Sequence, residues 1–363
     1  MSEAQAMSQP GPDPSGPAVT FNFKSTGNRF SGDAALAWTT WACAVSILLM
    51  VAALLTVLTV AAVPAIRTFG AHFLVGTEWR PNALEEQKRG PDGKLVFDED
   101  NEPVMVVTAP PAFGALPVVW GTTVTSVIAL FFAIPLSFGT AMFLLRIAPA
   151  VAVGPISFLV EFLAAIPSIA YGIWGLAVFG PFMQKHFEPQ LNSFFATVPG
   201  LGFLHFNGAT TGRDMLCGGL LLGIMIIPII TAISRDVLSA VPRAQIEGTT
   251  ALGATWWQSS KEMLKFSRSG LFGAVMLGLA RAAGETMAVT MVIGNKNQIM
   301  ASVLAPAQSM ASLLANEFAE ASDELHRSAL IEVALILLVM SLVFNVIARK
   351  LVVGKDSRSA AAH

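Results

Sequence analysis

Long apolar runs recur along the chain and are separated by shorter polar stretches. A spanning helix needs about 20 mainly apolar residues, and six runs reach this length. The pattern therefore predicts an all-α polytopic membrane protein with six transmembrane helices. The runs cover residues 34–63, 118–145, 156–179, 215–233, 269–293 and 329–353.

Two of these runs contain proline at their centres. Pro135 lies in the second run and Pro167 in the third. A proline inside a helix removes one backbone hydrogen bond, and the freed carbonyl must find a partner inside a helix bundle. We therefore expect both helices to be kinked and to line the interior of the bundle.

Composition agrees with this pattern. The chain has 363 residues, of which 54% are hydrophobic and 13% are charged, whereas a soluble domain carries about 25% charged residues. The net charge of −2 gives no basic surface of the kind that nucleic-acid-binding proteins use. No Ser/His/Asp or metal-ligand constellation is readable, so we expect no enzyme activity and no metal site in this chain.

The distribution of Lys and Arg predicts the orientation. With the amino terminus inside, 12 of these residues lie in inner segments and nine in outer ones, and five of the nine belong to one long outer loop. Long loops contribute little to the positive-inside rule, so both termini are expected to be cytoplasmic. The resulting organisation has a disordered tail (1–33), a first helix (34–63), an outer loop (64–117) with a charged insertion (84–107), a core (118–353) with an inner loop (234–268), and a short cytoplasmic tail (354–363).

Arg281 and Glu285 lie four residues apart inside the fifth apolar run. Charged side chains at bilayer depth cost about 2.5–3.5 kcal/mol each and persist mainly where they face a partner or a water-filled path. One helical turn separates the two, so they are predicted to pair. The pair either lines a path for a polar substrate or is a buried ion pair that only fixes helix packing.

Other residues of the apolar runs are weaker candidates. Glu161 lies near the inner end of the third run, where it either belongs to the path or is a carboxylate reaching the membrane interface. Gly278 and Gly284 belong to patterns of small residues spaced four apart in the fifth run. Such patterns allow close helix contact, so both glycines are predicted to pack against another helix.

The inner loop 234–268 predicts two short helices joined by a bend at Gly253. The loop contains many apolar residues, and small residues near Gly253 would let another surface approach closely. An alternative is an amphipathic helix resting on the membrane, with Trp256 and Trp257 at the interface.

This loop resembles the EAA loop of ATP-binding-cassette importer permeases, which docks on an ATPase subunit. The resemblance rests on Glu247, two small residues, and a glycine six positions after the glutamate, although Gly248 stands where the family usually has Ala or Ser. It implies that the coupling residues are Glu247, Gly248, Ala251, Leu252 and Gly253.

Two further stretches resemble the permease subunit of the phosphate-specific (Pst) importer, of the PstC type. They are residues 161–172 and the Arg-Ala-x-Gly-Glu-Thr-Met-Ala-Val block that begins at Arg281. The resemblance implies a type I importer permease (MetI-like) fold in the bacterial inner membrane and a phosphate path that includes Arg281, Glu285 and Glu161.

The same resemblance implies partners. These are a second permease (PstA type), an ATPase dimer (PstB type) and a periplasmic phosphate-binding protein (PstS type). No Gly-x-x-x-x-Gly-Lys-Ser/Thr motif occurs in the chain, so ATP and Mg²⁺ are expected only on the ATPase. Two alternatives remain at this point: a permease for another oxyanion, such as sulfate or molybdate, and a membrane sensor or scaffold that does not transport.

Overall fold

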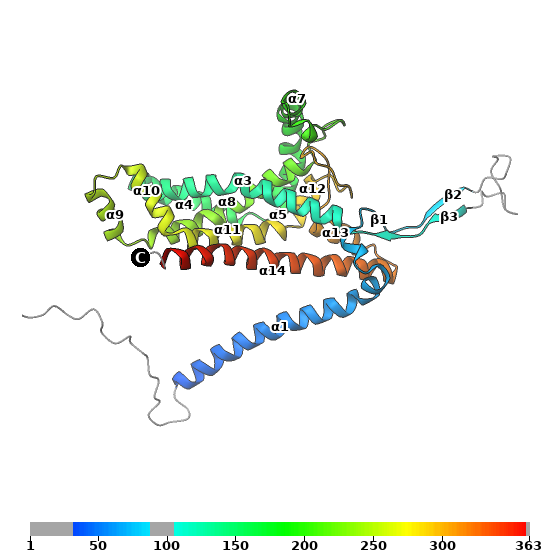
Figure 1. The fold of residues 1–363 in the computed structure, drawn as a ribbon, viewed down its shortest axis with the longest axis horizontal. Coiled ribbons are helices and arrows are strands. Elements are labelled where there is room, and N and C mark those ends of the chain that lie inside the picture. The colour runs from blue at the N-terminus through cyan, green and yellow to red at the C-terminus, as the bar shows by residue number, and fades with distance from the viewer. Residues whose placement is uncertain (1–31, 88–104, 361–363) are drawn as a thin grey trace, which may run out of the picture. The chain divides into compact units, whose positions relative to one another are not determined.

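The structure is a computed structural model that describes residues 32–87 and 105–360, and helices dominate the described part (Figure 1). The chain divides into two compact units between Leu54 and Leu55. In the first unit the described part is the amino-terminal portion of helix α1 (Gly32–Phe69). Most of the predicted tail and much of the charged insertion lie outside the described residues.

The second unit contains the rest of α1, which is held to helix α14 (Glu324–Ala360) by a serine. The Ser328 hydroxyl accepts a hydrogen bond from the Ala65 N–H (3.0 Å) and donates one to the Ala61 carbonyl (2.9 Å). In an uninterrupted helix the Ala65 N–H would bond directly to the Ala61 carbonyl. The Ser328 hydroxyl is inserted between these two groups, next to Pro64. The two helices are thereby joined at a fixed register.

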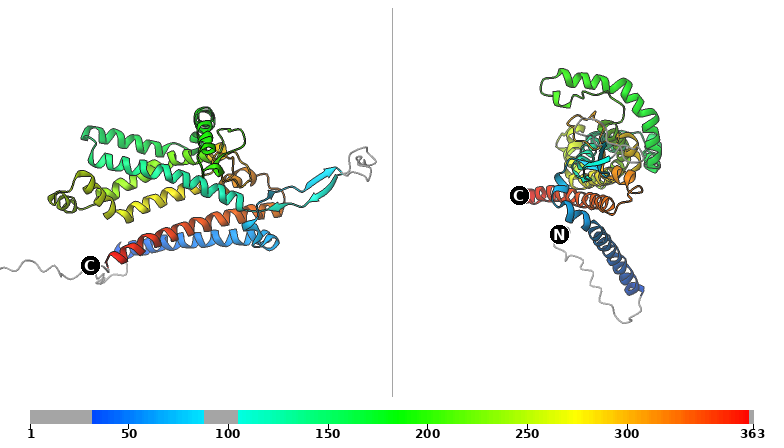
Figure 2. Two further views of the ribbon diagram at one scale, coloured as in Figure 1. Left: turned by 45° about the horizontal axis from the view of Figure 1, so that its top comes forward. Right: turned by 90° about the vertical axis from the view of Figure 1, so that its right-hand side faces the viewer.

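Helices α3 (Leu116–Arg146) and α8 (Met215–Ser239) form the most extensive helix contact (Figure 2). Small residues allow it, since a Cβ at Gly219 would lie 2.6 Å from Ile128 on α3. The Ser137 hydroxyl donates to the Ile227 carbonyl on α8. Helix α3 remains helical across Pro135, and helix α11 (Arg268–Ala283) packs on both α3 and α8.

The third apolar run is broken rather than kinked. Helix α4 (Ala150–Ala165) ends before Pro167, and helix α5 (Ser168–Trp174) continues at 90° to it. Helical structure then extends through the π-helical stretch η1 (Gly175–Phe179), α6 (Gly180–Phe182), the π-helical stretch η2 (Met183–Phe187) and α7 (Glu188–Thr197). Helix α7 is followed by the short 3₁₀ helix η3 (Gly202–Leu204).

A tyrosine stabilises this break. Pro167 has no N–H to donate to the Leu163 carbonyl, and the Tyr171 hydroxyl donates to that carbonyl instead, at 2.9 Å. The predicted interior position of this run is only partly correct. Tyr171 and Gly172 on α5 are buried, but no residue of α4 is buried within the chain.

The fifth run is also broken. Helix α11 ends at Ala283, and α12 (Met287–Val292) follows after three residues. By length and apolar character, four described helices could cross a membrane, or five if α4 and its bent continuation form one span. The predicted run 269–293 is not among them, because its helix stops at Gly284. The predicted count of six is therefore not reproduced.

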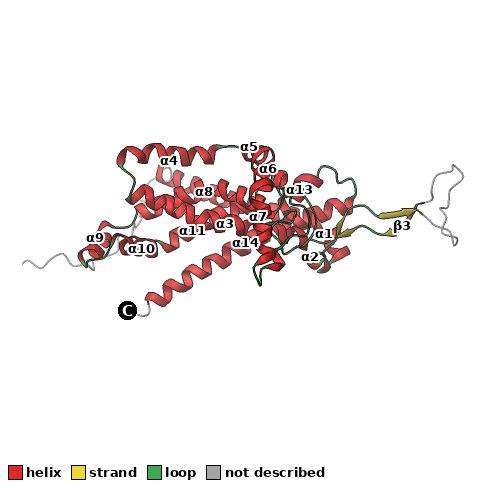
Figure 3. Cartoon of the chain, turned by 90° about the horizontal axis from the view of Figure 1, so that it is seen from above, coloured by secondary structure: helices red, strands yellow, loops and turns green. Residues whose placement is uncertain are grey.

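Short strands stand where the outer loop was predicted. Strand β1 (Trp79–Arg80) pairs with β4 (Ala112–Phe113), and β2 (Leu84–Gln87) pairs with β3 (Met105–Ala109), both antiparallel (Figure 3). Helix α2 (His72–Val75) precedes β1. The Trp79 indole and His326 both meet the carboxylate of Glu317 at the end of α13 (Met310–Glu317), at 2.8 and 3.1 Å. This cluster ties β1 to α13 and α14.

Glycine at position 121 is predicted to be required for the contact between α3 and the loop before α13. A Cβ added at Gly121 would lie 2.2 Å from the Gln308 carbonyl oxygen, so Gly121→Ala must displace backbone. We expect destabilisation of about 1–3 kcal/mol, seen as a lower thermal unfolding midpoint of the detergent-purified protein.

Gly139 on the same helix is the matched control, because a Cβ there meets nothing within 4 Å. Gly139→Ala should leave the midpoint unchanged or raise it slightly, since alanine favours helix. Equal midpoints for the two variants would contradict the packing described for α3.

Candidate functional site

The interruption between α11 and α12 carries the ion pair expected from the sequence. The Arg281 Nη2 and Glu285 Oε2 atoms are 3.6 Å apart. The two side chains differ in exposure: Glu285 is 5% exposed, whereas Arg281 is 51% exposed. The carboxylate is therefore sealed inside the chain, while about half of the arginine side-chain surface remains open to a ligand or to another subunit.

Glu285 has a second role, which the sequence did not reveal. Its Oε1 accepts a hydrogen bond from the Ala288 N–H at 3.4 Å, in the first turn of α12. A carboxylate is favourable at a helix N-terminus, where N–H groups are unpaired. The helix break therefore fixes the position of Glu285, and Glu285 in turn fixes one end of the Arg281 side chain.

A second broken helix meets the first at this place. Helix α5 packs on α12 so closely that a Cβ at Gly172 would lie 3.1 Å from the Cα of Ala288. Buried Tyr171, which holds the α4–α5 break, is the preceding residue. Discontinuous helices that meet inside a bundle are typical of transporter substrate sites, because their ends offer unpaired polar groups.

The other predicted path and packing residues have different outcomes. Glu161 is exposed on α4, and the structure does not bring it into the Arg281–Glu285 pair. Gly278 does pack closely, since its Cβ would lie 2.7 Å from Ile230 on α8. Gly284 ends α11, and within this chain the atom that lies within 4 Å of an added Cβ is the Ala280 carbonyl oxygen of the same helix. Packing of Gly284 against another helix stays a prediction.

The inner loop forms two helices, as expected. Helix α9 (Arg243–Ala251) and helix α10 (Trp256–Phe266) are joined by Gly253, whose φ of +82° is accessible mainly to glycine. Thr255 begins α10 with a capping box to Gln258. The five predicted coupling residues are exposed in this chain, and the exposed fraction of Leu252 is 91%. They are Glu247, Gly248, Ala251, Leu252 and Gly253.

The opposite side of this helical pair is buried against the bundle. Ile246 on α9 and Met263 on α10 belong to one apolar cluster with Leu238 at the end of α8 and Leu271 on α11. A force applied to the exposed side would therefore reach α8 and α11 through packed side chains. Helix α11 is the one that carries Arg281.

One buried acidic pair was missed in the sequence. Glu188 and Asp214 are 0% and 1% exposed. An Asp directly before an apolar helical run is a helix-start signal, which could have identified Asp214 as the N-cap of α8. Nothing in the sequence indicates that Glu188 joins it. The described residues contain no group of three or more side chains suited to a metal ion.

Comparisons with known proteins agree on one family. Residues 133–353 match the family described as "binding-protein-dependent transport system inner membrane component". The phosphate transport system permease protein PstC of Haemophilus influenzae is 41% identical over 310 residues, which cover 85% of this chain and 89% of that protein. PstC of Mesorhizobium japonicum is 38% identical over 95% of this chain and 98% of its own length. PstC of Pasteurella multocida is 40% identical over 87% of this chain and 90% of its own length.

The bend at Gly253 gives a structural prediction. Gly253→Ala places a Cβ in the left-handed region, which costs about 1–2 kcal/mol, although no atom lies within 4 Å of that Cβ. The hydrogen bonds that close the bend, from the Gly253 and Ala254 N–H groups, should then open roughly 5–30 times more often. Amide hydrogen exchange of these two residues measures this directly.

Two substitutions serve as controls for this experiment. The amides of residues 253 and 254 should exchange more slowly in Gly253→Asn than in Gly253→Ala, since asparagine tolerates the left-handed conformation. Gly248→Ala, in helix α9 with equally open surroundings, should not accelerate exchange. Rapid exchange in the Gly248 variant and none in the Gly253 variant would overturn the assignment of the bend.

Proposed function

The chain belongs to the binding-protein-dependent transport permeases and, within them, to the PstC phosphate transport permeases, and we therefore propose that it carries inorganic phosphate across the inner membrane into the cytoplasm. Membership of this family confirms the permease fold class and the transport role expected from the sequence. The chain is a subunit of an ATP-binding-cassette importer and not an enzyme. ATP hydrolysis falls to a separate subunit.

The observation that carries the proposal is the half-open ion pair at the helix breaks. Phosphate carries one to two negative charges at neutral pH, and a guanidinium offers planar, permanently charged donors that suit its oxygens. Arg281 has the exposed surface for such a contact, while Glu285 is held by α12. A second permease subunit, of the PstA type, would cover the exposed side of Arg281 and complete the path.

Glu285 is proposed to set the residence time of phosphate. A path must bind its ion well enough to admit it and weakly enough to release it. When the path is empty, Glu285 keeps Arg281 paired; when phosphate arrives, the nearby carboxylate repels it. Glu161 is kept as a third path residue, on α4, where a neighbouring subunit would have to bring it to the substrate.

The coupling surface is proposed to be the exposed side of α9 and the bend after it. Leu252 and its small neighbours would enter a groove on a PstB-type ATPase, because docking would remove from water the apolar surface of a leucine that is 91% exposed. Closure of the ATPase dimer would then move α8 and α11 through the shared apolar cluster. Alternating access by rigid movement of such helices is a general transport mechanism.

In this arrangement α9 and α10 face the cytoplasm and the strands face the periplasm. Both termini are then cytoplasmic, which agrees with the distribution of Lys and Arg. A PstS-type binding protein would deliver phosphate to the strand-bearing side. ATP and Mg²⁺ would be bound by the ATPase alone.

Removal of the guanidinium should stop transport. In proteoliposomes that contain the complete importer and its binding protein, Arg281→Ala is expected to reduce phosphate uptake at least tenfold, because a hydrogen bond to a charged group contributes about 1.5–3 kcal/mol. Arg281→Lys should retain part of the uptake, since the charge remains but the fork does not. Size-exclusion chromatography should show an intact complex for both variants.

Arg67→Ala is the matched control, because Arg67 is an exposed arginine in the last turn of α1. Its uptake should equal that of the wild type. Sustained uptake by an assembled Arg281→Ala complex would refute the path assignment, and absence of any phosphate uptake by the wild type would favour a sensor or scaffold. Uptake of sulfate or molybdate in place of phosphate would favour a different oxyanion.

Glu285→Gln should separate the electrostatic role of this residue from its structural one. The amide oxygen can still accept from the Ala288 N–H, but the negative charge is lost. We expect tighter phosphate retention, so both KM and kcat of uptake should fall, by several-fold each. Glu320→Gln, an exposed glutamate beyond α13, should change neither. A normal kcat in Glu285→Gln would show that the carboxylate charge plays no part in release.

A further inference from the structure

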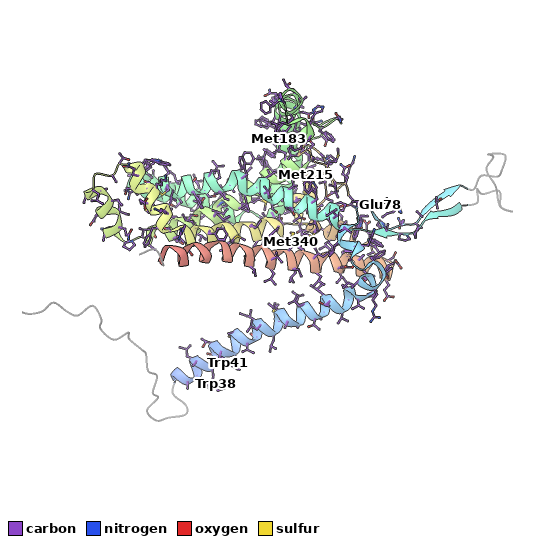
Figure 4. The ribbon with its side chains drawn as sticks, viewed as in Figure 1. Trp38, Trp41, Glu78, Met183, Met215 and Met340 are labelled. Atoms are coloured by element: carbon purple, nitrogen blue, oxygen red, sulfur yellow. The ribbon has the colours of Figure 1, made fainter. Side chains whose placement is uncertain are left out.

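Two carboxyl groups from separate segments are buried together where α7 begins and α8 begins. Glu188 is the first residue of α7, and Asp214 is the N-cap of α8. Both are essentially inaccessible, at 0% and 1% exposure, and they lie close enough for the charge of Glu188 to act on Asp214. Figure 4 labels Met183 on η2, the stretch that directly precedes α7, and Met215, the first residue of α8.

The hydrogen bonds to backbone leave one oxygen of each carboxyl group unused. Glu188 Oε2 accepts from the Gly212 N–H at 3.1 Å, and Asp214 Oδ1 accepts from the Cys217 N–H at 2.8 Å. The remaining atoms, Glu188 Oε1 and Asp214 Oδ2, are buried and have no protein donor. Two ionised carboxylates cannot hydrogen-bond to each other, whereas one shared proton would let one carboxyl group donate to the other.

No described cation neutralises the pair. The titratable group next to it is the buried Cys217 thiol on α8. Arg213 and the η2 residues Lys185 and His186 are exposed. The His186 ring is stacked on Phe182 instead.

A histidine and a lysine of the adjoining loops do not pair with the two carboxyl groups either. His205 has Nδ1 against the Asn192 carbonyl at 3.3 Å. Lys296, on the loop that approaches Arg213, is exposed. A proton is therefore the charge compensation available to the pair in the described part of the chain.

The pair lies at a tight junction of backbone segments. A Cβ at Gly212 would lie 2.2 Å from the Gly180 carbonyl oxygen, and a Cβ at Gly294 would lie 2.7 Å from the Arg213 carbonyl oxygen. Gly294 follows α12 by two residues. The segment 175–197, the start of α8 and the end of α12 are thus in direct contact around the two carboxyl groups.

We propose that Glu188 and Asp214 bind one proton between them and form a latch that holds the segment 175–197 against the first turn of α8. Loss of the proton leaves two buried negative charges that repel each other, and the latch opens. The latch is independent of the identity of the transported ion. In the importer it would make the mobility of this outer segment depend on the pH of the solution that bathes it.

The direction of the pH dependence follows from Asp214. Burial, and then the negative charge of Glu188, raise the pKa of Asp214 well above its ordinary value. A group whose pKa is raised on folding stabilises the closed state while it is protonated, so closure weakens as pH rises through the raised value. The latch is therefore closed in acid and opens toward alkaline pH.

Hydrogen exchange of the complete importer in lipid nanodiscs tests the latch. Protection factors, which correct for the intrinsic pH dependence of exchange, would be measured between pH 5.5 and 9 for peptides that cover residues 188–217. In the wild type we expect protection to fall about tenfold or more over this range. Peptides from α3 should show no such change.

Amide substitutions should remove this pH dependence. Glu188→Gln and Asp214→Asn each supply permanent N–H donors to the partner, and asparagine can still cap α8, so protection should stay high at all pH values. Glu320→Gln, an exposed glutamate, should behave as the wild type. If one amide variant fails to assemble, the other and the double variant give the same test.

Two results would overturn the proposal. One is pH-independent protection of the wild type across the range. The other is an amide variant that keeps the full pH dependence, since the titrating group would then lie elsewhere. Phosphate uptake need not be measured for either result, so failure of the latch and failure of the transport assignment are distinguishable.

Discussion

The structure depends on the requirement that every backbone polar group inside a bilayer has a partner. Two helices are interrupted, and each interruption is stabilised by a side chain from the same chain. The Leu163 carbonyl, which Pro167 leaves without its donor, is bonded by Tyr171. The first turn of α12 is bonded by Glu285 at the Ala288 N–H. Without these two polar side chains the breaks would leave backbone groups unpaired.

The two acidic sites illustrate different solutions to charge burial. Glu285 is paired with Arg281 and lies at a helix N-terminus, both of which favour a carboxylate. Glu188 and Asp214 face each other without a described cation, so a shared proton is the compensation we infer. The first site is open on the arginine side and suits an ion that must come and go. The second is closed on all sides and suits a structural lock.

Helix α8 connects these features. It begins at the Asp214 cap, packs along α3 and α11, and ends at Leu238 in the apolar cluster that supports α9 and α10. Contact with α11 is close at Gly278, three residues before Arg281. In the proposed mechanism, movement at the coupling surface would therefore reach the ion pair through α8 and α11, because packed helices shift as bodies and transmit displacement.

Sequence alone determined the membrane class, the two helices around Gly253, and the Arg281–Glu285 pair, because apolar runs, a glycine between helical patterns, and charges one turn apart are local signals. It did not reveal the helix breaks, which divide two predicted spans into shorter helices. Gly284 ends α11, and the next residue, Glu285, accepts a hydrogen bond from the first turn of α12. The meeting of Glu188 with Asp214 was likewise decided only by tertiary structure. Such outcomes depend on which distant groups come within hydrogen-bonding distance, and neither hydropathy nor residue spacing contains that information.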